Sequence, residues 1–164
     1  MNDSPASPPQ HTVPLQHSGL AGLALQLPPE KALLARRIVA KGRTPEPEEF
    51  DRRGKRLSAS EEAALRAWLD VGLCTRLLEE VRASDGTVKL LLGLPDGKKV
   101  ETVAMTVGAC CVSTQVGCAV GCRFCASGMF GVERHLSVDE IVEQVIHARR
   151  QMKIDRVVCR GMGE

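Results

Sequence analysis

Residues 136–160 read LSVDEIVEQVIHARRQMKIDRVVCR and decide the fold class of this chain. Ser137 and Glu140 form a capping-box signature, which predicts that a helix begins just after Ser137. Residues 155–160 predict a strand after the helix, and residues 110–116 predict an extended segment before it. Strand, loop, helix and strand in this order are the βαβ pattern of a parallel sheet. Apolar residues at helical spacing give the helix one face to bury: Val138, Ile141, Val142, Val145 and Ile146.

A β-hairpin is predicted upstream of this unit. The β-rich runs 88–94 and 100–105 flank the turn residues Pro-Asp-Gly at 95–97. A single βαβ unit leaves a sheet with open edges, which favours the start of a larger α/β barrel. We therefore expect a mixed α/β chain in which a hairpin linker at 84–109 leads into the first β-α-β of a partial (β/α) barrel at 110–164.

The first half of the chain predicts helices. Residues 1–20 are rich in Pro, Ser, Gln and His and predict a disordered leader. Residues 21–83 predict a helical accessory region. It contains a basic amphipathic helix at 30–41 and a second helix that Ser58 and Glu61 cap.

Several single residues carry expectations of their own. Trp68 is expected to anchor the core of the helical region, and residues 74–81 to form a further short helix. Cys74 and Cys159 are expected to pack as small apolar residues. His147 is expected on the surface of its helix.

Composition and charge exclude several classes of protein. Hydrophobic residues make up 43% and charged residues 26% of the chain, with a formal net charge of +2, as in soluble globular proteins. Aromatic residues are only 2%, so a base-stacking platform for single-stranded RNA is not indicated. No apolar run reaches the length of a membrane span, and the N-terminus does not resemble a secretory signal. The seven cysteines are therefore expected in a reducing cytoplasm, where clustered thiols more often bind metal than form disulfides.

Three cysteines lie close together in residues 117–128, GCAVGCRFCASG, at the spacing C-x-x-x-C-x-x-C. Thiolates bind zinc and iron–sulfur clusters, and structural zinc requires four ligands. Cys111 or His135 could supply a fourth ligand. Zinc sites usually combine two short motifs of the C-x-x-C or H-x-x-x-H kind, however, and this chain has a single group of three cysteines. A four-iron cluster held by three thiolates keeps one iron open for a ligand, and this fits the spacing better. The three thiols are Cys118, Cys122 and Cys125.

This spacing resembles that of radical S-adenosylmethionine (SAM) enzymes. GMGE at 161–164 stands where their glycine-rich SAM segment follows the second strand. Across residues 84–164 the chain resembles one subfamily, the RlmN/Cfr adenosine methyltransferases of RNA. Besides the three thiols, the positions that carry this resemblance are Cys111-Val112-Ser113, Gln115-Val116-Gly117, Phe124, Gly128, Gly131, Arg134, Leu136, Glu140-Ile141 and Gln144.

The resemblance implies a role for each candidate site residue. Cys118, Cys122 and Cys125 would ligate a [4Fe-4S] cluster. Cys111 matches the cysteine that resolves a covalent protein–RNA adduct, and Glu101 matches the proposed proton acceptor. The residues implied to contact SAM are Gly163 and Glu164.

The resemblance also implies an activity. Enzymes of this type methylate an adenine ring carbon, C2 or C8, of ribosomal RNA and in some cases tRNA, through a methylated cysteine. In the family that cysteine lies far downstream of the segment matched by 161–164, so residues 1–164 alone are expected to be inactive. The implied partners are the RNA and an electron donor such as flavodoxin or ferredoxin, and a monomer without membrane contact is expected. Two alternatives stay open: a radical SAM enzyme with another substrate, and a non-catalytic cysteine-rich zinc module.

Overall fold

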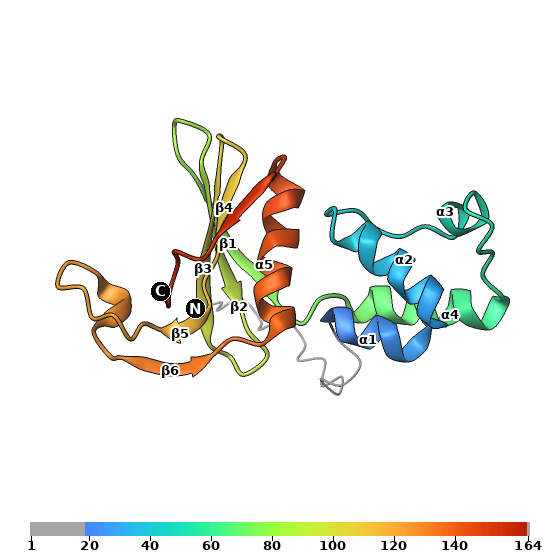
Figure 1. Cartoon of the computed structure of the whole chain (residues 1–164), viewed down its shortest axis with the longest axis horizontal. Coiled ribbons are helices and arrows are strands. Elements are labelled where there is room, and N and C mark those ends of the chain that lie inside the picture. Colours follow the sequence, from blue (N-terminus) through green and yellow to red (C-terminus); the bar gives the residue numbers. More distant parts are fainter. Residues whose placement is uncertain (1–18, 164) are drawn as a thin grey trace, which may run out of the picture.

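The computed structural model describes residues 19–163, so the predicted leader lies outside the described residues except for its last two positions. Gly19 and Leu20 already belong to the first helix. A group of four helices comes first, and a sheet with one long helix packed on it follows (Figure 1). The helices of the first group are α1 Gly19–Gln26, α2 Pro29–Val39, α3 Pro47–Asp51 and α4 Ala59–Val71.

The second half of the chain forms a five-stranded mixed sheet in the order β1-β2-β3-β4-β7. Its strands are β1 Arg76–Arg82, β2 Val88–Gly93, β3 Lys99–Met105, β4 Ala109–Cys111 and β7 Arg156–Val158. The smaller elements are β5 Gln115–Gly117 and β6 Val132–His135, which pair antiparallel, and a 3-10 turn, η2, at Ala126–Gly128. The long helix α5 spans Val138–Gln151.

The predicted βαβ unit is confirmed. Strands β4 and β7 pair in parallel, with Cys110 opposite Val157, and α5 makes the crossover between them. The predicted hairpin is also confirmed, because β2 and β3 pair antiparallel from Val88 and Ala104 to Gly93 and Lys99. The chain therefore has the expected mixed α/β fold.

Helix α5 covers one face of the sheet and fixes which side chains are buried. On that face Leu90, Leu92 and Val100 are fully buried, and Ile141 and Val145 of α5 pack against the same cluster. Each such Leu or Val contributes about 1.5–3 kcal/mol by leaving water. The opposite face of the sheet is open to solvent at Lys89 and Glu101.

The helical group has a core of its own that reaches α5. Trp68 is buried, as predicted, and its indole N–H donates to the carbonyl oxygen of Gly19 at 2.8 Å. Leu23, Phe50 and Leu65 belong to this core, and so does Ile146 of α5. The predicted capping box of α4 is present, because Ser58 accepts from the amide of Glu61.

The expectations for residues 74–81 and for two single residues were wrong. From Arg76 onward the segment forms strand β1, which pairs antiparallel with β2, because long-range strand pairing outweighs its local helical pattern. Cys159 is exposed instead of packed. His147 is buried instead of lying on the helix surface.

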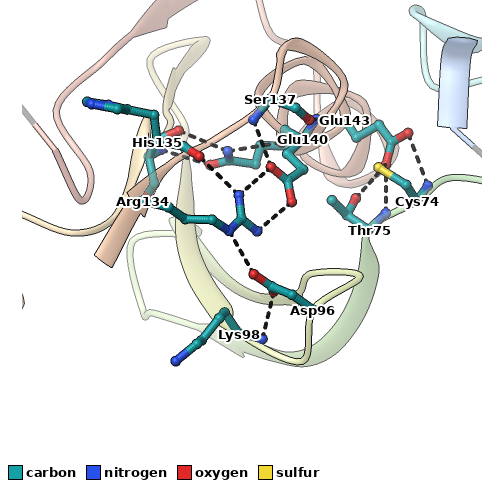
Figure 2. A network of polar contacts seen from close by, with 11 residues as sticks. Cys74, Thr75, Asp96, Lys98, Arg134, His135, Ser137, Glu140 and Glu143 are labelled. Atoms are coloured by element: carbon teal, nitrogen blue, oxygen red, sulfur yellow. Dashed lines mark hydrogen bonds and ion pairs between the residues drawn. The ribbon is translucent and has the colours of Figure 1, made fainter. Parts of the chain in front are cut away.

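A buried carboxylate joins the helical group to α5 (Figure 2). Glu143 is fully buried and accepts hydrogen bonds from the amide and thiol of Cys74, at 3.1 and 3.2 Å. It also accepts from the amide and hydroxyl of Thr75, at 2.7 and 2.8 Å. Burial raises the pKa of Glu143 even though these four donors oppose the shift. Cys74 is therefore a hydrogen-bond donor at a junction and not merely a small apolar residue.

His147 completes this junction as a neutral imidazole. Its Nε2 lies 3.1 Å from the hydroxyl oxygen of Thr75. Because that hydroxyl already donates to Glu143, His147 is assigned as the Nε2–H tautomer that donates to Thr75. Burial, with the nearby charge of Arg150, lowers the pKa of His147 to about 4.

We expect His147→Gln to remove a pH dependence of stability. The unfolded chain protonates this imidazole near pH 6.5, whereas the folded chain resists protonation down to about pH 4. As the pH falls through this window the unfolded state binds the proton, so the free energy of unfolding falls by up to about 3 kcal/mol. Urea unfolding at several pH values should show this loss for wild type and a flatter profile for His147→Gln. Glu143 is present in both proteins, so the difference isolates His147, and equal slopes would contradict this account.

Candidate functional site

The three cysteines at the spacing C-x-x-x-C-x-x-C lie in the loop 118–131, between β5 and β6. The base of this loop is closed, because the amide of Cys118 donates to the carbonyl oxygen of Gly131 at 3.1 Å. Gly117 has a φ of +79°, and a Cβ there would overlap the same carbonyl oxygen. Only glycine therefore lets the two ends of the loop approach so closely.

The structure gives the three thiols different exposures. Cys118 is buried, whereas Cys122 and Cys125 are half-buried. The amide of Cys125 donates to the carbonyl oxygen of Cys122 at 3.0 Å, which turns the chain between them. Within residues 19–163 no group of three or more His, Cys, Asp or Glu side chains is arranged to hold a metal ion. The loop thus keeps the three cysteines on one segment without assembling them into a ligand set.

The glycine segment 161–163 lies directly against the chain that leads into this loop. The amide of Gly161 donates to the carbonyl oxygen of Val112 at 3.0 Å. The amides of Thr114 and Gln115 both donate to the carbonyl oxygen of Met162, at 2.8 and 3.1 Å. These bonds fix the glycine segment beside the residues that precede Cys118.

The close approach explains the glycines. A Cβ at Gly161 would lie 2.6 Å from the hydroxyl oxygen of Ser113. Gly163 has a φ of +87°, and a Cβ there would lie 2.5 Å from Cγ of Gln115. The remaining predicted SAM contact, Glu164, lies outside the described residues.

One buried polar atom beside this segment has an unused hydrogen-bonding capacity. Gln115 packs its Cβ and Cγ against Gly163, and its Oε1 is buried with no hydrogen-bond partner among the described residues. A buried acceptor of this kind calls for a donor. The glycine segment, this acceptor and a loop with three thiols and no histidine fit a bound ligand next to an iron–sulfur cluster.

Glu101 and Cys111 lie on the same face of the sheet. Cys111 pairs with Val103, and Glu101 is two residues before Val103 on β3, so both side chains leave the sheet opposite α5. Glu101 is exposed, and the ammonium group of Lys89 donates to its carboxylate at 3.0 Å. The structure therefore places on one face of the sheet the two residues for which the resemblance implied catalytic roles.

The neighbouring cysteines differ in environment. Cys110 is fully buried in the core on the α5 side, and burial raises the pKa of its thiol to about 12. Cys111 is half-buried on the open face. Cys110 therefore fills core volume, which leaves Cys111 as the thiol on the side of Glu101.

An arginine that the sequence analysis left without a role ties the cysteine loop to α5 (Figure 2). The guanidinium of Arg134 donates to both carboxylate oxygens of Glu140, at 2.9 and 2.8 Å, and to Asp96 at 2.7 Å. Glu140 also accepts from the amide of Ser137 at 2.7 Å. Burial acts to raise the pKa of Glu140, but the bonds from Arg134 and Ser137 outweigh it and lower the pKa. The capping box predicted the contact between Ser137 and Glu140, but no local sequence signal pointed to the contacts of Arg134.

Comparisons with known proteins agree with the resemblance seen in the sequence. No family model matches the chain. A protein named as a probable dual-specificity RNA methyltransferase RlmN, from Prochlorococcus marinus, is 47% identical over 103 residues, which cover 58% of this chain and 29% of that protein. A probable RNA methyltransferase from Leptothrix cholodnii is 50% identical over 101 residues, which cover 62% of this chain and 28% of that protein.

A solved structure is similar over nearly the whole chain. It is a radical SAM methyltransferase from Sphaerobacter thermophilus, with a TM-score of 0.64 and 32% sequence identity over 92% of this chain and 47% of that one. The present chain thus spans less than a third of these curated relatives and about half of the solved structure. The predicted resemblance to radical SAM RNA methyltransferases of the RlmN type is confirmed.

We expect Arg134→Lys to destabilise the fold even though it keeps the charge. Lysine cannot make the paired bonds to Glu140 and the further bond to Asp96, so the free energy of unfolding should fall by about 1–2 kcal/mol in urea titrations. Arg66→Lys is the matched control, because Arg66 lies 4.0 Å from Glu62 on an exposed helix surface. Its effect should stay within about 0.5 kcal/mol. Equal effects of the two substitutions would show that the Arg134 contacts are not important for stability.

Proposed function

We propose that this chain is part of a radical SAM RNA methyltransferase that methylates an adenosine ring carbon of ribosomal RNA, with tRNA as a second candidate substrate. Cys118, Cys122 and Cys125 would hold a [4Fe-4S] cluster, and Gly163 and Glu164 would contact SAM. The observation that carries this proposal is the hydrogen bonding of residues 161–163 to residues 112–115. These bonds place the glycine segment, which packs closely against residues 113–115, next to the loop that carries three thiols.

At this site the protein would orient the bound ligand and form hydrogen bonds with it. A bound [4Fe-4S] cluster supplies one electron to SAM and so gives access to radical chemistry. The Ser113 hydroxyl accepts from the Met162 amide, and the Thr114 hydroxyl donates to the Gly163 carbonyl oxygen. Side chains therefore hold the backbone of the glycine segment, and Gln115 Oε1 offers a buried acceptor beside it. An ammonium or amide donor of a ligand would satisfy that acceptor.

The open face of the sheet is the proposed place of the RNA chemistry. Glu101 would accept a proton there, and the Cys111 thiol would resolve the protein–RNA adduct. Both residues lie on the same face of neighbouring strands, and the ammonium group of Lys89 donates to the Glu101 carboxylate at 3.0 Å. Their shared face supports this assignment. The methyl-carrying cysteine is proposed to lie outside residues 1–164, so that this part alone does not complete turnover.

The wider setting follows from the same proposal. The five-stranded sheet and α5 would be the start of the partial (β/α) barrel, with the helical group at 21–83 as an accessory region. A one-electron donor such as flavodoxin or ferredoxin would reduce the cluster in a reducing cytoplasm. Among residues 19–163, none of the helices has the length and apolar character of a membrane span. A radical SAM enzyme with another substrate is the alternative within the same chemistry.

Anaerobic reconstitution with iron and sulfide tests the cluster. We expect a brown protein with about four irons per chain, and we expect Cys118→Ala to lose most of that iron. Cys159→Ala is the matched control, because Cys159 is an exposed cysteine outside the loop, and it should keep the full iron content. A colourless protein that binds one zinc ion per chain would overturn the proposal and favour a zinc module.

Gly163→Ala tests the glycine segment as a ligand site. A Cβ at this position collides with Gln115, so the cluster-loaded variant should bind SAM at least about tenfold more weakly in equilibrium dialysis. Gly97→Ala is the control. Gly97 also has a positive φ, +82°, but no described residue would lie within 4 Å of a Cβ added there. It should keep wild-type affinity. Unchanged binding by Gly163→Ala would remove this segment from the proposed SAM site.

A further inference from the structure

Ser113 joins three segments that are distant in the sequence. It is fully buried after the end of β4. Its hydroxyl donates to the carbonyl oxygen of Glu101 at 2.7 Å and accepts from the amide of Met162 at 2.9 Å. One side-chain oxygen thus connects the strand of Glu101, the chain that leads to the cysteine loop, and the glycine segment 161–163.

Gln144 on α5 holds the backbone of Ser113. Its Oε1 accepts from the amide of Ser113 at 2.8 Å, and its Nε2 donates to the carbonyl oxygen of Ser113 at 2.9 Å. The same side chain accepts from the hydroxyl of Thr102 at 2.7 Å and donates to the carbonyl oxygen of Glu140 at 3.1 Å. All four hydrogen-bonding positions of the amide are used, which fixes its orientation in the core.

The size of Ser113 is matched to the glycine segment. The Cα of Gly161 comes so close that a Cβ there would lie 2.6 Å from the Ser113 hydroxyl oxygen. Ser113 therefore contacts this segment through a hydrogen bond at Met162 and through direct packing at Gly161. Neither Ser113 nor Gln144 received a role from the sequence beyond lying in the resembling pattern.

We propose that Ser113, held by Gln144, is a positioning residue that sets residues 161–163 relative to Glu101 and the cysteine loop for ligand binding. This inference rests on the proposed function, because the ligand meant is SAM. If Ser113 had only a structural role, replacing it would weaken SAM binding no more than replacing any other residue of similar importance for stability. A positioning residue should affect the glycine segment and the ligand specifically.

The first test is amide hydrogen exchange of the full chain in its metal-free form. In Ser113→Ala the Met162 amide loses its acceptor, so its exchange should accelerate about 5- to 30-fold. Ser137→Ala is the matched control, because it also removes a hydroxyl that bonds a backbone amide, that of Glu140 at the start of α5. Its effect on the Met162 amide should be less than about threefold. The inference is wrong if the two variants change this amide equally.

The second test is SAM binding by the cluster-loaded chain. We expect the dissociation constant to rise about tenfold in Ser113→Ala and less than threefold in Ser137→Ala, although both lower the stability. Thr102→Val removes one donor to Gln144 while nearly keeping the side-chain volume, and should give a smaller shift in the same direction. The inference is contradicted if Ser113→Ala and Ser137→Ala weaken SAM binding equally. It is also contradicted if Ser113→Ala or Thr102→Val leaves the dissociation constant of SAM unchanged.

The two tests separate this inference from the proposed function. If the wild-type chain assembles no cluster and binds no SAM, the proposed function fails. Hydrogen exchange in the metal-free chain still decides whether Ser113 holds residues 161–163 in place.

Discussion

Buried polar groups require hydrogen-bond partners, and helix α5 uses this requirement to connect the parts of the chain. Glu143 accepts four hydrogen bonds from Cys74 and Thr75, at the end of the helical group. Gln144 holds the backbone beside the glycine segment, and Glu140 binds the guanidinium that follows the cysteine loop. Because one rigid helix carries all three side chains, the helical group, the loop and the glycine segment share a common frame.

The parts of the fold that could be predicted from the sequence are those with local signals. The capping box at Ser137 and the alternating runs of the hairpin depend on neighbours within a few residues, and they predicted α5, β2 and β3. Strand β1 was missed because its pairing with β2 outweighs a helical pattern. The buried side of α5 was only partly predicted, since Val138 is largely exposed while Glu143 is fully buried. Its partners come from a segment about 70 residues away, and no local pattern contains them.

For the candidate site, too, local sequence signals predicted some features, and long-range contacts determine the others. Spacing alone placed the three thiols in one loop, and the resemblance supplied the proposed roles of Glu101 and Cys111. Which of two adjacent cysteines faces the core depends on strand register, which the structure provides through the pairing of Val103 with Cys111. The contact between residues 112–115 and 161–163 depends on a parallel crossover. Sequence could predict that crossover as a βαβ unit but could not give its individual hydrogen bonds.

The two outer strands of the described sheet differ in how they meet solvent. Strand β1 presents Glu79, Glu80 and Arg82, whose charges discourage another chain from adding to that side. Strand β7 ends the described sheet on the other side, where Arg156 and the apolar Val157 are both exposed. Wherever β7 is left as an outer strand, another strand can add to it, and a lysine in place of Val157 should oppose that addition.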